Sequence, residues 1–365
     1  MRLKKKVVSS LVSIVTALSL SYGIANADLI LKKDGSKIYN YYLSNEDVNS
    51  VTVKNKKGEE LCIPKSEIKD YVFTAKDIDE KTANLLEELK AMEDWGEEKL
   101  GVPKSDNYLE YDESFTTYHM LYYCKKLELP KTYFDLDAEY FKSEDEALNR
   151  KAELEPKGYD VYYRTAEAVA NGSVISKEMI ESELDRKLFV IFHENSHDLT
   201  DLLIDVDEAC ANIAGFFGGL AYIEEKYGKG SDEYKKYSKL IEKVDKDDEI
   251  IIKYYDKLEQ LLNSNLPEKE KLKEKDKIFE DLADEQSKLW GRTIEKNNNP
   301  GIASDVTYSR FGPLAKKVYE KAGSTKEAIK VFKDLSDKIK WIQYMYPEDE
   351  TRDYCKKYLE DYLNS

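Results

Sequence analysis

Hydrophobic and polar positions are arranged in two different ways along this chain. Between residues 28 and 75, short β-prone runs are separated by Asp34-Gly35 and Lys57-Gly58, which are dipeptides typical of hairpin turns. From residue 76 onward, apolar side chains recur mostly at three- and four-residue steps, as they do on amphipathic helices. The pattern predicts an α+β protein with a small β module at 28–75 and a mainly helical domain at 76–365.

The helical part contains two recognisable segments and one expected strand. Residues 77–100 predict an amphipathic helix that links the β module to the main body. Residues 231–296 carry an apolar stripe among many charges and are interrupted at Asn265-Leu266-Pro267, so we expect an antiparallel helical hairpin with a solvated Lys and Glu face. Residues 159–164 alternate in polarity and predict a strand, and the rest is expected to be helical.

One predicted helix, at about residues 183–202, carries the densest chemical signal. It contains His193-Glu194-Asn195-Ser196-His197, which uses two of the three histidines of the chain. His193 and His197 are four residues apart on one helix face, so both imidazoles can reach a single ion. Two neutral imidazoles suit zinc, and Glu194 is placed to accept a proton from a water molecule. We therefore expect zinc as cofactor and Glu194 as general base.

A catalytic zinc needs a third protein ligand, and Glu208 is the first candidate. Residues 204–207 predict a turn, after which Glu208 would lie in the first turn of a second helix that folds back on the first. Alternatively, this carboxylate only stabilises a helix N-terminus, in which case Asp205 or Asp207 would be the ligand. Asn212, one turn further, is expected to hold a ring nitrogen of a ligand histidine.

The order of these motifs resembles a known group of enzymes. His193-Glu194-x-x-His197 followed by Glu208 resembles the gluzincins, which are thermolysin-like zinc peptidases. Over about residues 108–340, the chain also resembles the bacterial predicted zinc aminopeptidases. That resemblance rests on three blocks, which are 158–164, 192–197 with 207–211, and 298–299 with 307–310 and Pro313. The chain departs from that family at Asp198 and Asp207, where Gln and Asn are usual.

The resemblance implies a zincin-like catalytic domain that hydrolyses peptide bonds of peptides or proteins with zinc on His193, His197 and Glu208. It favours Tyr308, ahead of Arg310, as the group that stabilises the oxyanion. It also suggests that the strand at 159–164 pairs with an extended substrate backbone, the alternative being a plain strand of the sheet. The aminopeptidase motif Gly-x-Met-Glu-Asn is absent before the zinc helix, so endopeptidase and exopeptidase modes both remain open.

The N-terminus predicts export. Residues 1–6 are basic, residues 7–22 are mostly apolar, and Ala25-Asn26-Ala27 is a small-x-small cleavage site, so residues 1–27 form a predicted signal peptide. The β module at 28–75 resembles a small SH3-like barrel, which would either dock to a cell-envelope partner or serve as a stabilising appendage. A formal net charge of −16 makes nucleic acid an unexpected partner.

Two further expectations concern single residues, and one concerns function. Cys124 and Cys355 are a conceivable disulfide pair in an exported chain, although no cysteine spacing indicates a second metal site. His119, on an expected apolar helix, is assigned to the core or surface rather than to catalysis. The alternative to an exported zinc metallopeptidase is an inactive envelope binding protein that keeps the zinc fold and docks through residues 28–75.

Overall fold

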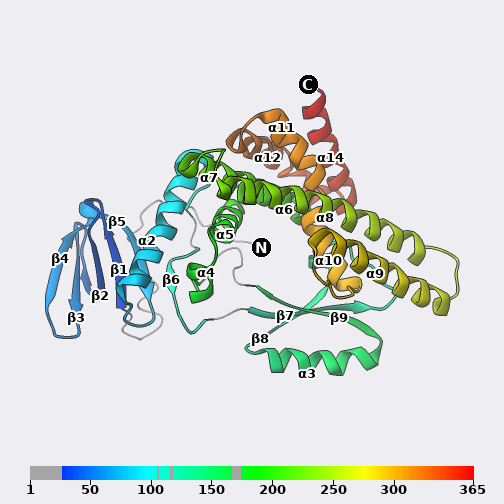
Figure 1. Ribbon diagram of the computed structural model, residues 1–365, viewed down its shortest axis with the longest axis horizontal. Helices are drawn as coiled ribbons and strands as arrows, with labels where there is room; N and C mark the ends of the chain where they lie inside the picture. Colours follow the sequence, from blue (N-terminus) through cyan, green and yellow to red (C-terminus); the bar gives the residue numbers. More distant parts are fainter. Residues whose placement is uncertain (1–26, 105–106, 116–117, 167–173) are drawn as a thin grey trace.

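The computed structural model describes residues 27–365 except 105–106, 116–117 and 167–173, so nearly all of the expected signal peptide lies outside the described residues. Figure 1 shows two sheets and a larger set of helices. The strands are β1 (Ala27–Lys32), β2 (Lys37–Glu46), β3 (Ser50–Asn55), β4 (Glu60–Pro64), β5 (Ile68–Thr74), β6 (Glu110–Tyr111), β7 (Tyr118–Lys125), β8 (Asp137–Phe141) and β9 (Tyr159–Ala166).

Helices dominate the rest of the chain, which confirms a mainly helical α+β protein. The α-helices are α2 (Glu80–Trp95), α3 (Glu144–Leu154), α4 (Lys177–Glu181), α5 (Leu184–Ser196), α6 (Ile204–Asn212), α7 (Gly219–Tyr227), α8 (Asp232–Leu262), α9 (Glu268–Trp290), α10 (Asn299–Ser309), α11 (Gly312–Ala322), α12 (Thr325–Ile339), α13 (Ile342–Met345) and α14 (Glu348–Asn364). The short 3-10 or π segments are η1 (Lys65–Glu67), η2 (Gly96–Leu100), η3 (Tyr133–Asp135), η4 (Glu155–Lys157) and η5 (Ile213–Gly218).

The first sheet has the strand order β4-β3-β2-β1-β5-β6. Its hairpin turns fall where the sequence predicts them, because Gly35 and Gly58 both adopt a φ of 84°, which glycine accepts without a steric penalty. On one face of the sheet, side chains that include Ile30 and Val53 pack against one another. The other face contributes Leu29 and Val72 to the main core of the protein. The SH3-like closure into a barrel stays a prediction.

A second sheet, with the order β8-β7-β9, corrects the expectation that the remainder is helical. His119 lies on β7 rather than on a helix, and its Nδ1 is 2.8 Å from the Tyr163 hydroxyl. Residues 118–123 are rich in aromatic side chains, which favour β-strands. This strand pairs with β8 on one edge and β9 on the other. Helix α3 covers one face of this sheet and α10 the other (Figure 1). Because the strand order is β8-β7-β9, strand β9 lies at one edge of this sheet.

The histidine motif sits on α5, which is buried in the main core by Leu188, Ile191 and Phe192. Helix α6 follows after a short loop and begins at Ile204, so the expected turn at 204–207 is wrong. Asp205 and Asp207 occupy its first turn, where acidic side chains are stabilised by the helix dipole.

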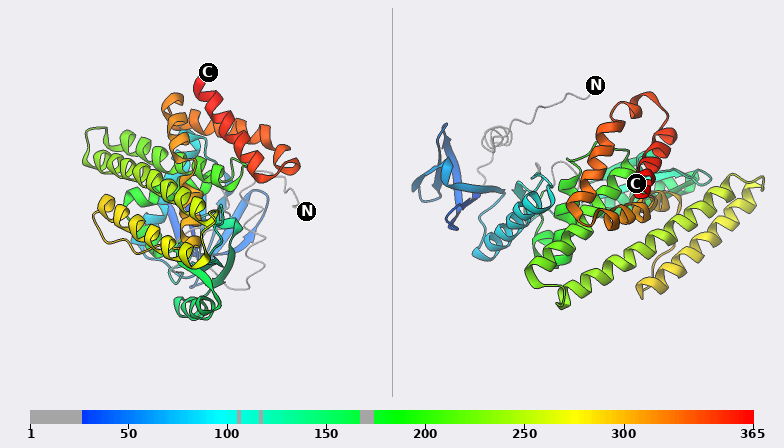
Figure 2. Two further views of the ribbon diagram at one scale, coloured as in Figure 1. Left: turned by 90° about the vertical axis from the view of Figure 1, so that its right-hand side faces the viewer. Right: turned by 90° about the horizontal axis from the view of Figure 1, so that it is seen from above.

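The hairpin of α8 and α9 has the antiparallel arrangement that the apolar stripe predicts, and Figure 2 shows it at the opposite end of the molecule from the first sheet. Helix α10 packs on this hairpin through Ile302 and Val306. It begins after Asn298, whose side chain accepts the Gly301 N–H at 3.0 Å. Asparagine is a strong N-cap residue, which explains why the helix begins there.

All four cysteines are free, so Cys124 and Cys355, whose pairing the sequence leaves open, do not form a disulfide in this structure. Within the described part of the chain, none of the helices combines the length and the apolar character needed to cross a lipid bilayer.

Candidate metal centre

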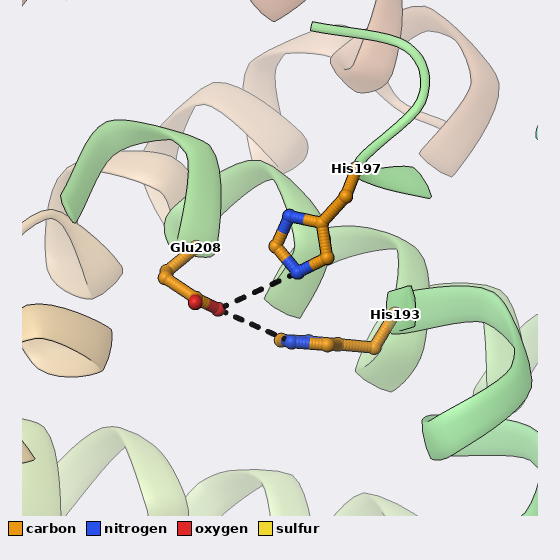
Figure 3. Close-up of side chains that lie close together, drawn as sticks. All are labelled: His193, His197 and Glu208. Carbon is orange, nitrogen blue, oxygen red and sulfur yellow. Dashed lines mark ion pairs between the residues drawn. The ribbon is translucent and has the colours of Figure 1, made fainter. Parts of the chain in front are cut away.

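Helices α5 and α6 bring the three expected ligands together. Glu208 Oε2 lies 3.1 Å from His193 Nε2 and 3.8 Å from His197 Nε2, and Figure 3 shows the three side chains pointing toward one another. One ligand atom from each residue falls within a group no wider than 4.8 Å. His193 and Glu208 are buried, and His197 is nearly so. The arrangement follows from the four-residue spacing on α5 and from the return of α6 across it.

The chemistry of these atoms fits a zinc ion. Glu208 Oε2 is buried and accepts no hydrogen bond from the residues that the structure describes. A buried acceptor left in this way costs about 1–3 kcal/mol, which a cation facing it would offset. Burial acts to raise the pKa of Glu208, but the two imidazoles and the Tyr133 hydroxyl outweigh it and hold that pKa below its ordinary value. Two imidazoles and one carboxylate are a donor set typical of catalytic zinc.

Asp207 orients His197. Its Oδ2 lies 2.6 Å from His197 Nδ1, and its Oδ1 accepts a hydrogen bond from the Thr200 hydroxyl. Burial acts to lower the pKa of His197, but the hydrogen bond to Asp207 and the charge of Glu208 outweigh it and raise the pKa to about 9. With Nδ1 donating to Asp207, Nε2 is the nitrogen that faces Glu208, and it would offer its lone pair to a metal ion once its proton is released.

The structure corrects the role expected of Asn212. Its Nδ2 donates to the backbone carbonyl of Tyr308 at 3.2 Å, so it joins α6 to α10 instead of holding a histidine. Asp207 takes the position beside His197 because α6 begins one turn earlier than expected. The sequence signal for this contact is the carboxylate directly before Glu208, which the pattern offers only as an alternative metal ligand.

Tyr133 is a site residue that sequence reasoning missed. Its hydroxyl donates to Glu208 Oε1 at 2.9 Å, which leaves Oε2 facing the two histidines. Its ring stacks on the Tyr308 ring at a centroid distance of 6.0 Å, and its backbone N–H donates to the Thr307 hydroxyl at 3.0 Å. No spacing could indicate it, because it lies 75 residues before Glu208 in a chain with 28 tyrosines.

The remaining candidate residues are Tyr308, Glu194 and Arg310. Tyr308 is half-buried beside the centre, with its ring centroid 6.3 Å from that of His193. Glu194 is half-buried on α5. Burial raises the pKa of Tyr308, and the charges of Glu208 and Glu194 raise it further. Arg310 instead donates to the Lys131 carbonyl at 2.8 Å, and its Nε lies 3.5 Å from Asp205 Oδ2.

Asp205 forms an ion pair with an arginine and does not contact a ligand histidine in the described structure. It is fully buried, and its Oδ2 accepts a hydrogen bond from Arg352 Nε on α14 at 2.6 Å. This ion pair ties α6 to the C-terminal helix. Of the two alternatives to Glu208, one therefore holds a histidine and the other an arginine.

Comparison with known proteins places the chain in a family. No curated protein and no solved structure matches it. A family model matches residues 54–342, which cover most of the chain and include the histidine helix, Glu208, Tyr133 and Tyr308. The chain therefore belongs to the family described as "Putative aminopeptidase".

Proposed function

We propose that this chain is an exported zinc-dependent peptidase of the gluzincin type. The observation that carries the proposal is the convergence of two imidazole nitrogens and a carboxylate oxygen, within 4.8 Å, beside the glutamate of a His-Glu-x-x-His helix. His193, His197 and Glu208 would hold the ion. When bound there, zinc polarises a carbonyl group and lowers the pKa of water to about 7.

The residues around that position have separate roles in peptide hydrolysis. Glu194 takes a proton from the attacking water and later delivers it to the leaving amine as the carbon–nitrogen bond breaks. Tyr308 donates its hydroxyl to the oxygen that becomes negatively charged when water adds to the carbonyl carbon. Its position beside His193 supports this role. Asp207 and Tyr133 hold His197 and Glu208 in place.

Two further features concern how the substrate binds and where the protein acts. The outer edge of β9 pairs with no other strand of the described chain, so an extended peptide can add to it by backbone hydrogen bonds. The basic and apolar residues at 1–22 and the site at 25–27 direct export and removal of the leader. The family assignment supports a peptidase, and aminopeptidase action is one mode that product analysis would identify.

The test is hydrolysis of a peptide library by the zinc-loaded mature protein, with products read by mass spectrometry. Glu194→Gln should bind zinc normally and lose nearly all turnover, because the proton acceptor is gone. The matched control Glu225→Gln, on α7 and exposed, should stay active. A chelator should abolish turnover, and zinc should restore it.

Two results would count against the proposal. Cleavage that survives Glu194→Gln or chelation would show that another mechanism operates. Bound zinc with no cleavage of any peptide would favour the envelope binding protein as the function.

A further inference from the structure

Arg164, on β9, differs from other cationic side chains that lie deep in this protein. It is half-buried, and its Nη1 donates to the Ser304 hydroxyl at 3.2 Å. Among the residues that the structure describes, no carboxylate oxygen lies within 4.0 Å of its guanidinium. Buried cations elsewhere face a carboxylate, namely Lys90 with Glu93 at 2.7 Å, Lys275 with Asp160 at 2.6 Å and Arg352 with Asp205 at 2.6 Å. Since a charge removed from water is costly without a partner, Arg164 is suited to receive one.

The immediate surroundings of Arg164 are phenols. Its charge acts on Tyr122, Tyr162 and Tyr308, and its Cζ lies 6.0 Å from the centre of the Tyr308 ring. Asp305 is the acidic side chain that α10 brings to this region. That carboxylate accepts a hydrogen bond from Asn297 Nδ2 at 2.7 Å and stays beyond ion-pair distance from Arg164. The guanidinium therefore lies among phenol groups, with the Asp305 charge close enough to act on it but no carboxylate in contact with it in the described part of the chain.

This position is within reach of the metal centre. The Tyr308 ring lies 6.3 Å from the His193 ring and 6.0 Å from Arg164 Cζ, so the guanidinium is at most about 12 Å from His193. An extended peptide advances about 3.3–3.6 Å per residue, so one to three residues bridge that distance. Arg164 also lies on the edge strand along which we expect the substrate to run.

We propose that Arg164 is a substrate-recognition site for a peptide carboxylate one to three residues away from the bond that is cleaved. The inference rests on the proposed peptidase function for the position of that bond. A guanidinium can bind a carboxylate through two parallel hydrogen bonds, which a lysine cannot reproduce. The carboxylate is either the C-terminus of a short peptide or the side chain of an aspartate or glutamate.

The experiment measures binding apart from turnover. Zinc-loaded Glu194→Gln protein is titrated calorimetrically with tetra-alanine as free acid, tetra-alanine amide, and an amide with one alanine replaced by glutamate. The free acid should bind at least about tenfold more tightly than the amide, as a charge-assisted bidentate contact implies. Recovery of binding by the glutamate-containing amide identifies a side-chain carboxylate as the ligand, and no recovery identifies the C-terminus.

The variants assign the preference to Arg164. In the same background, Arg164→Gln should bind acid and amide equally, and Arg164→Lys should keep only part of the preference. The control Arg150→Gln, which removes an arginine from α3 on the other face of the same sheet, should leave it intact. If Arg164→Gln does not fold, as judged by its thermal melt, the Arg164→Lys result decides.

Equal binding of acid and amide by the parent protein overturns the inference, and so does a preference that Arg164→Gln or Arg164→Lys leaves unchanged. These outcomes are separate from a failure of the proposed function. Cleavage without any carboxylate preference removes only the role of Arg164. A carboxylate preference in a protein that cleaves nothing keeps that role and removes the peptidase.

Discussion

At the scale of single residues, two ligands of the candidate centre are each held by a second side chain. Asp207 binds the outer nitrogen of His197, and Tyr133 binds the outer oxygen of Glu208. In both cases the inner atom is left aimed at the shared position. Such partners keep a ligand in the right tautomer or rotamer before the ion arrives, so less ordering is needed when it binds.

Replacing Tyr133 with phenylalanine should therefore weaken zinc binding about 10–100-fold without unfolding the protein. The ring that stacks on Tyr308 remains, and only the hydrogen bond to Glu208 is lost. Competition with a chelator of known affinity measures the effect. The control is Tyr123→Phe, which removes a similar hydroxyl–carboxylate bond to Glu139 on the other face of the sheet. Zinc affinity equal to that of the unaltered protein would show that Tyr133 does not position Glu208.

The meeting of His193, His197 and Glu208 could be predicted from the sequence because the information for it is local. His193 and His197 share a helix face at a fixed spacing, and Glu208 follows within one helical hairpin. Tyr133 and Arg164 could not be found in this way. Their contacts join the short segment η3 or strand β9 to helices more than 70 residues away, and nothing in a linear pattern marks such a meeting.

At the scale of elements, the centre depends on how closely α5 approaches η5, the π-helical continuation of α6. A Cβ atom on Gly215 would lie 2.7 Å from Phe189 Cδ2 and 3.1 Å from the Phe189 carbonyl oxygen. Phe189 in turn contacts His193, with ring centroids 5.0 Å apart. The absence of a side chain at Gly215 thus sets the distance between the two helices that supply the ligands.

Gly215→Ala should destabilise the protein by about 1–3 kcal/mol, because the added methyl group meets a ring and a backbone atom that cannot both move freely. Urea unfolding measures the loss as a lower midpoint with little change in slope. Gly230→Ala is the matched control, since a Cβ there meets nothing within 4 Å. If both variants unfold at the same urea concentration, the close approach of the two helices carries no energetic weight.

Helices and strands differed in how far they could be predicted. Long amphipathic segments such as α8 and α9 have a period that no other structure shares. Strand β7 has no comparable signature, because Tyr122 and Tyr123 are both apolar enough for a helix and its pairing partners lie elsewhere in the chain. Its identity is decided by β8 and β9, which cover both of its edges.

At the scale of the whole molecule, Asp28 is a buried carboxyl group in a strongly acidic protein. The chain carries a net charge of −16, and most carboxylates in its described part are at least partly exposed. Asp28 is instead 2% exposed. Burial raises its pKa to about 7, against opposing hydrogen bonds from the Tyr71 hydroxyl and the Leu43 N–H. The folded protein therefore holds a proton there that the unfolded chain releases near pH 4.

A raised carboxyl pKa makes folding less favourable as pH rises from about 4 to about 7, by roughly 1.4 kcal/mol per pH unit for one group. Asp28→Asn should remove that slope and be more stable than the unaltered protein at pH 8, as denaturant unfolding at several pH values would show. Asp256→Asn, at an exposed position on α8, should keep the original slope. Parallel pH profiles for Asp28→Asn and the unaltered protein would contradict a proton held at Asp28.

The way the first sheet is built into the protein limits how its purpose can be studied. Leu29 and Val72 belong to the same apolar core as the histidine helix, and β6 comes from beyond residue 100 to pair with β5. Lys104 also forms an ion pair with Asp70 at 2.7 Å. Cutting the chain at residue 76 would leave β6 without its neighbour and open the main core to water. A docking role for this sheet is better separated from its architectural role by altering its outward-facing side chains one at a time.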